Sequence, residues 1–259
     1  ESAPERVLQA TRTCLEQWDQ TAGLSDASLD RCICALEESD VELVPELLTR
    51  IREPHSVGRL FVRWWQHHPD AADEFLPSLT DEQRVWVIRG LLSTDEDALT
   101  PDRRRELVSL AISLQPYASS EAVAWEIAKL GAALDPDLAR KAWQAIRPID
   151  PAEDKRLTIE FALDSLVAIG TAFEQRQQNT SGPEVAEIKR LLDNAPEKGT
   201  WEYQYTALLA GIYAYYDGPL CKRTVQDLVT SLDSAPKQVS REHVLAWALP
   251  ALARVDMQG

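Results

Sequence analysis

The sequence is poor in glycine and cysteine and has no long apolar run, and each shortage excludes a class of protein. Only 10 of its 259 residues are glycine. Because turns between strands depend on glycine, this scarcity argues against a many-stranded β architecture. The 4 cysteines are too few for a disulfide scaffold of this length. We therefore expect a helical protein in a reducing, cytoplasmic setting.

Membrane and secretion signals are also missing from the sequence. A membrane-spanning helix needs about 20 mostly apolar residues, and the longest apolar run of the C-terminal half, Ala207 to Tyr216, is too short. The first residues, Glu1 to Pro4, lack the basic and then apolar pattern of a signal peptide. The chain does not start with methionine, so we interpret it as processed or trimmed and expect a domain of something longer.

Acidic residues dominate the charge of the chain. It has 42 Asp and Glu against 27 Lys and Arg, a net charge of −15. Such a surface repels nucleic-acid phosphates and anionic lipid, so neither is an expected partner. The charge favours a protein partner with a basic or mixed surface.

The hydrophobic period is helical throughout, with no alternation long enough for a strand. Stop and start signals predict roughly twelve or thirteen helices. Those with clear bounds are expected at about 4–20, 26–38, 41–52, 56–66, 69–75, 151–178, 184–194, 200–216, 220–232 and 240–255.

Several helix starts are marked by capping signals. Thr80 with Gln83 fits a capping box, in which each side chain bonds the backbone of the other residue. Asp135 before Pro136, and Asp150 before Pro151, each resemble an N-cap followed by proline at the first helical position.

Four glycines recur at nearly equal intervals, namely Gly90, Gly131, Gly170 and Gly211. Glycine costs a helix roughly 0.5–1 kcal/mol relative to alanine, so its recurrence suggests close approach of neighbouring backbones. A helical hairpin about every 40 residues is typical of a HEAT-like α-solenoid. We expect stacked helical hairpins, with an irregular helical bundle as the alternative. The expected subdomains are residues 1–94 and 95–259, or one continuous stack.

One segment resembles a single tetratricopeptide unit. Residues 124–151 place Trp125, Leu130, Gly131, Ala139 and Ala142 in an order similar to that family's pattern. The spacing from the tryptophan to Leu-Gly departs from the family, and the unit does not recur after about 34 residues. The resemblance implies a helical hairpin for this segment only.

Catalytic and metal-binding motifs are missing from the sequence. There is no glycine-rich phosphate loop, no His-Glu-x-x-His and no Gly-x-Ser-x-Gly. Cys32 and Cys34 project about 200° apart on a helix, so they cannot hold one metal ion together. Cys34 or Cys221 could form a dyad with a histidine only if the fold brings them together. We therefore expect no enzyme activity, no cofactor and no metal, with an enzyme or small-ligand pocket between helices as the alternative.

Aromatic residues next to arginines offer the best candidates for binding. Trp64 continues an apolar stripe, while Trp65 falls on its flank, and an aromatic beside arginine is typical of interface hot spots. The alternative is that Trp65 packs inside the protein. The candidate interaction residues are Arg59, Arg63, Trp64, Trp65, His67, His68, Tyr213 and Tyr215.

The other tryptophans lie near leucines or alanines at helical spacing, so core positions are expected for Trp18, Trp86, Trp125, Trp143, Trp201 and Trp247. Together these features predict a non-catalytic protein-interaction module, with a regulatory, sensor or scaffold role in a larger bacterial system. The sequence does not determine the oligomeric state.

Overall fold

The structure is a computed structural model. The residues that it describes are Arg6, Gln9, Thr13 and the ranges 43–51, 53–114, 121–176, 180–194, 200–237 and 239–258. Within these ranges every regular element is a helix and no strand occurs, which confirms the all-helical class. No helix of the described residues is long and apolar enough to cross a membrane. The helix expected at about 4–20 is described at three residues only, and the one at 26–38 lies outside the described residues.

The chain divides into two compact units. The first is Glu1–Thr100 with Ser113–Ser119, and the second is Pro101–Ile112 with Ser120–Gly259. These are packing units, and the sequence-based division into residues 1–94 and 95–259 remains a prediction about domains.

The first unit is built around a pair of packed helices, α4 and α6. Its helices are α3 (Leu43–Arg50), α4 (Pro54–His67), α5 (Pro69–Phe75) and α6 (Asp81–Leu92), with short 3-10 helices at Leu76–Ser78 and Glu96–Ala98. The buried stripe of α4 contains Val57, Leu60, Phe61 and Trp64, as the spacing of three and four residues predicts.

Two glycines set the distance between α4 and α6. A Cβ atom on Gly58 would lie 2.7 Å from the carbonyl oxygen of Trp86, and one on Gly90 would lie 2.7 Å from Cγ2 of Val62. Both separations are far below van der Waals contact, so the backbones can cross this closely only without those side chains.

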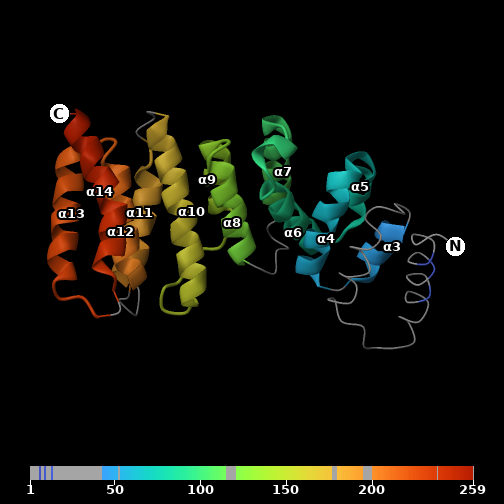
Figure 1. Ribbon diagram of the computed structural model, residues 1–259, viewed down its shortest axis with the longest axis horizontal. Coiled ribbons are helices and arrows are strands. Elements are labelled where there is room, and N and C mark those ends of the chain that lie inside the picture. Colours follow the sequence, from blue (N-terminus) through green and yellow to red (C-terminus); the bar gives the residue numbers. More distant parts are fainter. Residues whose placement is uncertain are drawn as a thin grey trace. The chain divides into compact units, whose positions relative to one another are not determined.

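The second unit is a set of helices standing side by side, as Figure 1 shows for α8 to α14. They are α7 (Pro101–Leu114, of which the residues up to Ile112 belong to this unit), α8 (Glu121–Ala132), α9 (Pro136–Gln144), α10 (Arg156–Gln175), α11 (Gly182–Asn194), α12 (Thr200–Tyr213), α13 (Gly218–Leu232) and α14 (Arg241–Gln258). Consecutive members of the series α8, α10, α12, α14 pack against one another. Helices α9, α11 and α13 each pack on the helix before and the helix after.

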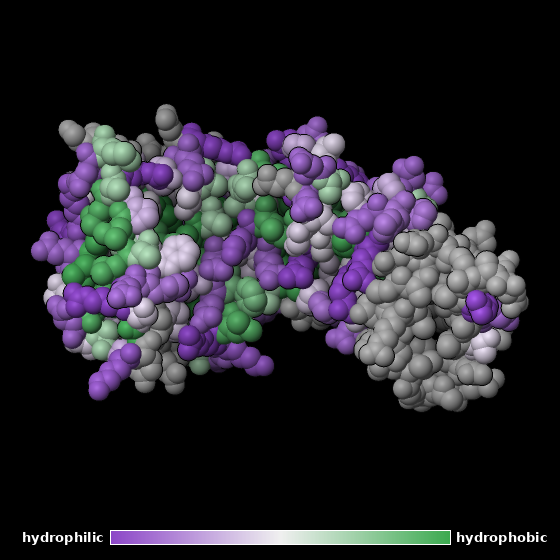
Figure 2. Space-filling model, viewed as in Figure 1, coloured by the Kyte–Doolittle hydropathy of each residue, from purple (hydrophilic) through white to green (hydrophobic). Residues whose placement is uncertain are grey.

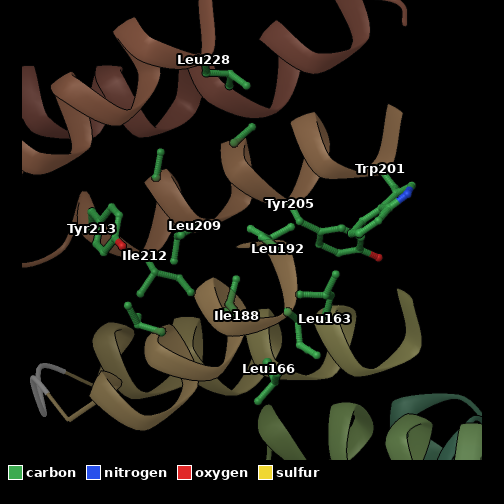
Figure 3. Close-up of a cluster of buried hydrophobic side chains, with 14 of the residues drawn as sticks. Leu163, Leu166, Ile188, Leu192, Trp201, Tyr205, Leu209, Ile212, Tyr213 and Leu228 are labelled. Carbon is green, nitrogen blue, oxygen red and sulfur yellow. The ribbon is translucent and has the colours of Figure 1, made fainter. Parts of the chain in front are cut away.

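The main core of this unit lies around α12. Trp201, Tyr205, Leu209 and Ile212 are buried along one stripe, and Figure 3 shows them facing side chains of α10 and α11. Two small residues of α12, Ala207 and Ala210, are buried as well, as is Ala214 directly after the helix. This helix is therefore packed against other helices on more than one side, as expected from its high apolar content.

Two of the predicted helix caps are confirmed. Thr80 Oγ1 accepts the Gln83 N–H at 3.3 Å, and the Gln83 side chain accepts the Thr80 N–H at 3.0 Å. Asp135 caps α9 by accepting the N–H groups of Asp137 and Leu138, both at 3.1 Å.

The helix start predicted at Asp150 and Pro151 is wrong. The Asp150 carboxylate accepts the Ala152 N–H at 2.9 Å, while the Asp150 N–H donates to Asp154 at 2.7 Å. These bonds close a separate turn, and α10 begins only at Arg156. Asp154 is also bound by Arg147, so a contact from outside the helix fixes the turn in place.

The recurring glycines do not share one packing role. A Cβ on Gly90 would clash, one on Gly170 would lie 3.0 Å from Cδ1 of Ile212, and one on Gly131 would make ordinary contact at 3.4 Å. Around Gly211 nothing lies within 4 Å of that position. The expectation of close backbone approach at each glycine is therefore wrong, and the spacing gives no support to a repeat.

Candidate functional site

Helix α4 carries five of the eight residues predicted to bind a partner, and a sixth, His68, directly follows it. Trp64 is buried, and Trp65 is only 9% exposed. Trp64 packs edge-on against Phe61 and Phe75, with ring centroids 5.8 and 5.7 Å apart. Both indoles therefore belong to the core alternative, which corrects the expectation of an aromatic surface here.

The remaining residues of this group are polar and lie nearer the surface. Arg59, Arg63 and His67 are exposed, and His68 is half-buried at the junction of α4 and α5. A partner-binding role for these four residues stays a prediction, now without an exposed tryptophan among them.

The tyrosines at the end of α12 are separated by the fold. Tyr213 is buried in the core, with Lys189 Nζ 5.3 Å from its ring centroid. Tyr215 is half-buried, and the Arg254 guanidinium lies 3.9 Å from the centroid of its ring. Neither phenol presents a free aromatic rim, because one is in the core and the other is covered by α14.

The described residues contain no cluster of three or more His, Cys, Asp or Glu side chains that could hold a metal ion. Cys221 is fully buried, and burial raises the pKa of its thiol, which leaves a poor nucleophile. Cys14, Cys32 and Cys34 lie outside the described residues.

Buried charges in the second unit serve packing. Arg140 of α9 holds the fully buried carboxylate of Glu184 on α11, with both of its N–H···O distances at 2.6 Å. The same guanidinium donates to the carbonyl of Thr180 and lies 3.7 Å from the centroid of the Phe173 ring. This pair ties α9, α10 and α11 together.

The sequence analysis missed the outer face of α14. We use this name for six exposed residues: Ala246, Trp247, Leu249, Pro250, Ala253 and Met257. Trp247 is 43% exposed, Leu249 58% and Met257 81%. Figure 2 shows apolar surface over the α13 and α14 end of the molecule.

Helix α14 is apolar on two sides. Its buried stripe, Val244, Ala248 and Ala251, packs with α12 and α13. With 3.6 residues per turn, Ala246 and Ala253 fall on the opposite side. The exposed side of a helix is normally polar, yet here it carries these apolar residues.

Trp247 lies at the edge of this face. Its Nε1 donates to Nε2 of His243 at 3.4 Å, and the two rings meet edge-on with centroids 6.3 Å apart. The expectation of a core position for Trp247 is wrong. Its spacing among leucines and alanines is real, but it follows the exposed stripe of a helix that has two apolar stripes.

The charge around α13 and α14 differs from that of the whole chain. Residues 218–258 have five Lys or Arg against four Asp or Glu, a net charge of +1, whereas the chain carries −15. This end of the sequence is therefore close to neutral, because its positive and negative charges nearly cancel.

Comparison of the chain with protein-family models, with curated proteins and with solved structures finds no match.

Proposed function

We propose that this chain is a non-catalytic protein-interaction module that binds a partner through the outer face of α14. The observation that carries the proposal is the exposed apolar side of a helix whose other apolar side is buried. Contiguous exposed apolar residues mark interaction sites in folded proteins, whereas apolar residues scattered singly do not.

We also propose that the second unit is a stack of helical hairpins, α8 with α9, α10 with α11 and α12 with α13, followed by α14. The support is the order of contacts, since each hairpin packs on the next one along the chain.

The test is affinity capture from the native host, with the full chain as bait and mass spectrometry as the readout. The double variant Leu249→Gln with Met257→Gln removes apolar surface from the outer face. Leu157→Gln is the matched control, because Leu157 on α10 is also an exposed leucine, at 61%. Proteins retained by the wild type and by the control should be lost with the double variant.

Identical protein sets retained by all three chains would remove the outer face of α14 as the binding site. Circular dichroism of each variant keeps this comparison independent of unfolding, because the changed residues are exposed and should leave the helical signal unchanged.

A further inference from the structure

We infer that a buried polar cluster at the C-terminal end of α10 binds a monovalent metal cation, with the carboxylate of Glu174 as its one charged ligand. The cluster consists of Glu174 on α10, Ser181 directly before α11, Tyr213 at the end of α12 and Tyr216 just beyond it. Three observations support the site: a buried carboxylate oxygen without a partner, the meeting of three helices, and an unbalanced charge. The inference does not depend on the function proposed for α14.

The carboxylate of Glu174 supplies the first observation. Glu174 is only 2% exposed. Its Oε1 accepts the Ser181 N–H at 3.2 Å, whereas its Oε2 is buried and has no hydrogen-bond partner in the part of the chain that the structure describes. An ionised carboxylate is costly to bury unless a charge or hydrogen bonds compensate it, and buried polar atoms are normally paired. A cation in contact with Oε2 would supply this compensation.

The other members of the cluster contribute hydroxyl oxygens. The hydroxyl of Tyr213 is also buried without a hydrogen-bond partner. Its ring meets that of Tyr216 edge-on, with centroids 6.0 Å apart. The Tyr216 phenol is hydrogen-bonded to the Ser181 side chain and is close enough to Glu174 for the two to interact electrostatically. Hard metal cations take oxygen ligands, which this cluster provides.

The meeting of α10, α11 and α12 places these side chains in one cluster. A Cβ atom on Gly170 would lie 3.0 Å from Cδ1 of Ile212 and 3.8 Å from Cβ of Ser181. Glu174 is one turn beyond Gly170 and therefore lies on the same side of α10. Tyr213 directly follows Ile212. The side of α10 that carries the unpaired carboxylate is thus the side on which the other two helices approach most closely.

The charges in this part of the core do not balance. Two carboxylates, Glu174 and Glu184, are buried, and one guanidinium, that of Arg140, lies among them. Arg140 donates to both oxygens of Glu184 at 2.6 Å, so its charge is matched there. Helices α10 and α12 both end at this cluster, and a helix C-terminus carries partial negative charge. A cation would neutralise the charge of Glu174.

The ligands indicate which kind of ion fits. Calcium and magnesium prefer several carboxylate or carbonyl oxygens, and the described residues contain no group of three or more His, Cys, Asp or Glu side chains around one point. One carboxylate with neutral hydroxyl oxygens suits sodium or potassium. Of the four residues only Tyr216 is exposed, so a small ion suits the site better than an organic amine.

The test is urea denaturation of the full chain in sodium chloride, potassium chloride and N-methylglucamine chloride at equal ionic strength. The anion and the screening are then constant, and the organic cation is too large for a buried site. Either alkali ion should raise the folding equilibrium constant about tenfold at a concentration ten times its dissociation constant. The gain should grow as the alkali ion replaces N-methylglucamine.

Variants assign this effect to the cluster. Glu174→Gln keeps an acceptor for the Ser181 N–H and removes the charge, so its stability should be the same in the three salts. Tyr213→Phe should weaken the apparent affinity for the ion about threefold, as for one lost neutral oxygen ligand. Glu153→Gln is the matched control, because Glu153 is an exposed glutamate of the same unit, and it should respond to the salts like the wild type.

Equal stability of the wild type in the three salts overturns the inference, because a proton or a water molecule would then satisfy Oε2. A salt response that Glu174→Gln retains, or that Glu153→Gln also loses, overturns it as well. Sodium NMR of the wild type gives a readout that does not depend on how the variants fold. The folded chain should broaden the sodium line and added potassium should narrow it, whereas a line as narrow as that of buffer with urea-unfolded chain contradicts the site.

Discussion

Helices α10 and α14 are both long and rich in alanine and leucine, yet they meet their surroundings differently. Helix α10 packs against α8, α9, α11 and α12, whereas α14 packs against α12 and α13. Polar side chains of α10, such as Ser165 and Glu174, are buried. On α14 the reverse holds, since Leu249 and Met257 are exposed. Composition alone therefore does not reveal which helix is in the core and which one offers a surface.

The comparison shows that the surroundings of an apolar residue determine whether it stabilises the fold. On α10, apolar residues stabilise the fold by leaving water. On the outer face of α14 they stay in contact with water, so they contribute little to the stability of the folded chain. Four predictions test this division, from the largest expected effect to the smallest.

The largest effect should come from the ion pair that ties α10 to its neighbours. Arg140→Ala leaves the fully buried Glu184 carboxylate without its partner, and an uncompensated buried charge costs about 3–5 kcal/mol of unfolding free energy. Urea denaturation measures the loss. The double variant Arg140→Ala with Glu184→Gln should recover part of it, and a loss below about 1 kcal/mol for Arg140→Ala would show that the pair is not structural.

The second prediction compares one leucine from each helix. Leu166 of α10 is fully buried and Leu249 of α14 is largely exposed. Leu166→Ala should lower the free energy of unfolding by about 2–5 kcal/mol, whereas Leu249→Ala should change it by at most about 0.5 kcal/mol. Similar losses for both, in matched denaturation curves, would mean that the outer face is already covered within the chain.

A smaller effect is expected from the buried hydroxyl of α10. Ser165 Oγ lies 2.6 Å from the carbonyl oxygen of Trp125 and 2.8 Å from that of Phe161, so it links α10 to α8. Ser165→Ala removes this link and should cost about 1 kcal/mol. Thermal unfolding checks it, and Thr158→Ala, at a half-buried position of the same helix, is the control, expected to cost less.

The smallest effect concerns Tyr216, beside the C-terminal end of α10. Burial, followed by the charges of Tyr213, Glu174 and Asp217, raises the pKa of its phenol from 10.0 to about 12. The folded state holds this proton more tightly than the unfolded state. Its contribution to stability is therefore fully present below pH 10 and is lost as the pH rises to about 12.

Ultraviolet titration of the phenols measures this shift. Tyr216→Phe should remove one phenol that ionises near pH 12, and Glu174→Gln should lower the pKa of Tyr216 because it removes a neighbouring negative charge. If Tyr216→Phe instead removes a phenol that ionises near pH 10, the assignment is contradicted.

The sequence predicts much of the fold because most helix boundaries here are local. The Thr80 capping box and the Asp135 cap depend on residues within three positions, so their patterns are readable without tertiary structure. At Asp150 the same pattern gives a turn, because Arg147 and Asp154 complete a bonding set that competes with the helix. Whether a local capping pattern gives a helix or a turn therefore depends on contacts with other residues, which the spacing of apolar residues does not show.

The outer face of α14 was harder to predict for a similar reason. The residues of α14 show two apolar stripes, and periodicity alone does not say whether a second stripe is covered. The candidate residues on α4 show the opposite case. Trp64 and Trp65 project about 100° apart on the helix, yet both are buried within the first unit. The signal available in the sequence was that α14 has apolar residues on two sides, with Trp247 among them.

Pro250 would make binding at the proposed outer face selective. Proline has no N–H, so the carbonyl oxygen of Ala246, one turn earlier, lacks its helical donor. While the face is exposed, water can satisfy that oxygen. A ligand that covers it with hydrocarbon alone would strand it at a cost of about 1–3 kcal/mol, whereas a ligand with a serine or asparagine at that point would not. The N–H group that Pro250 lacks would thus discriminate between ligands of equal hydrophobicity.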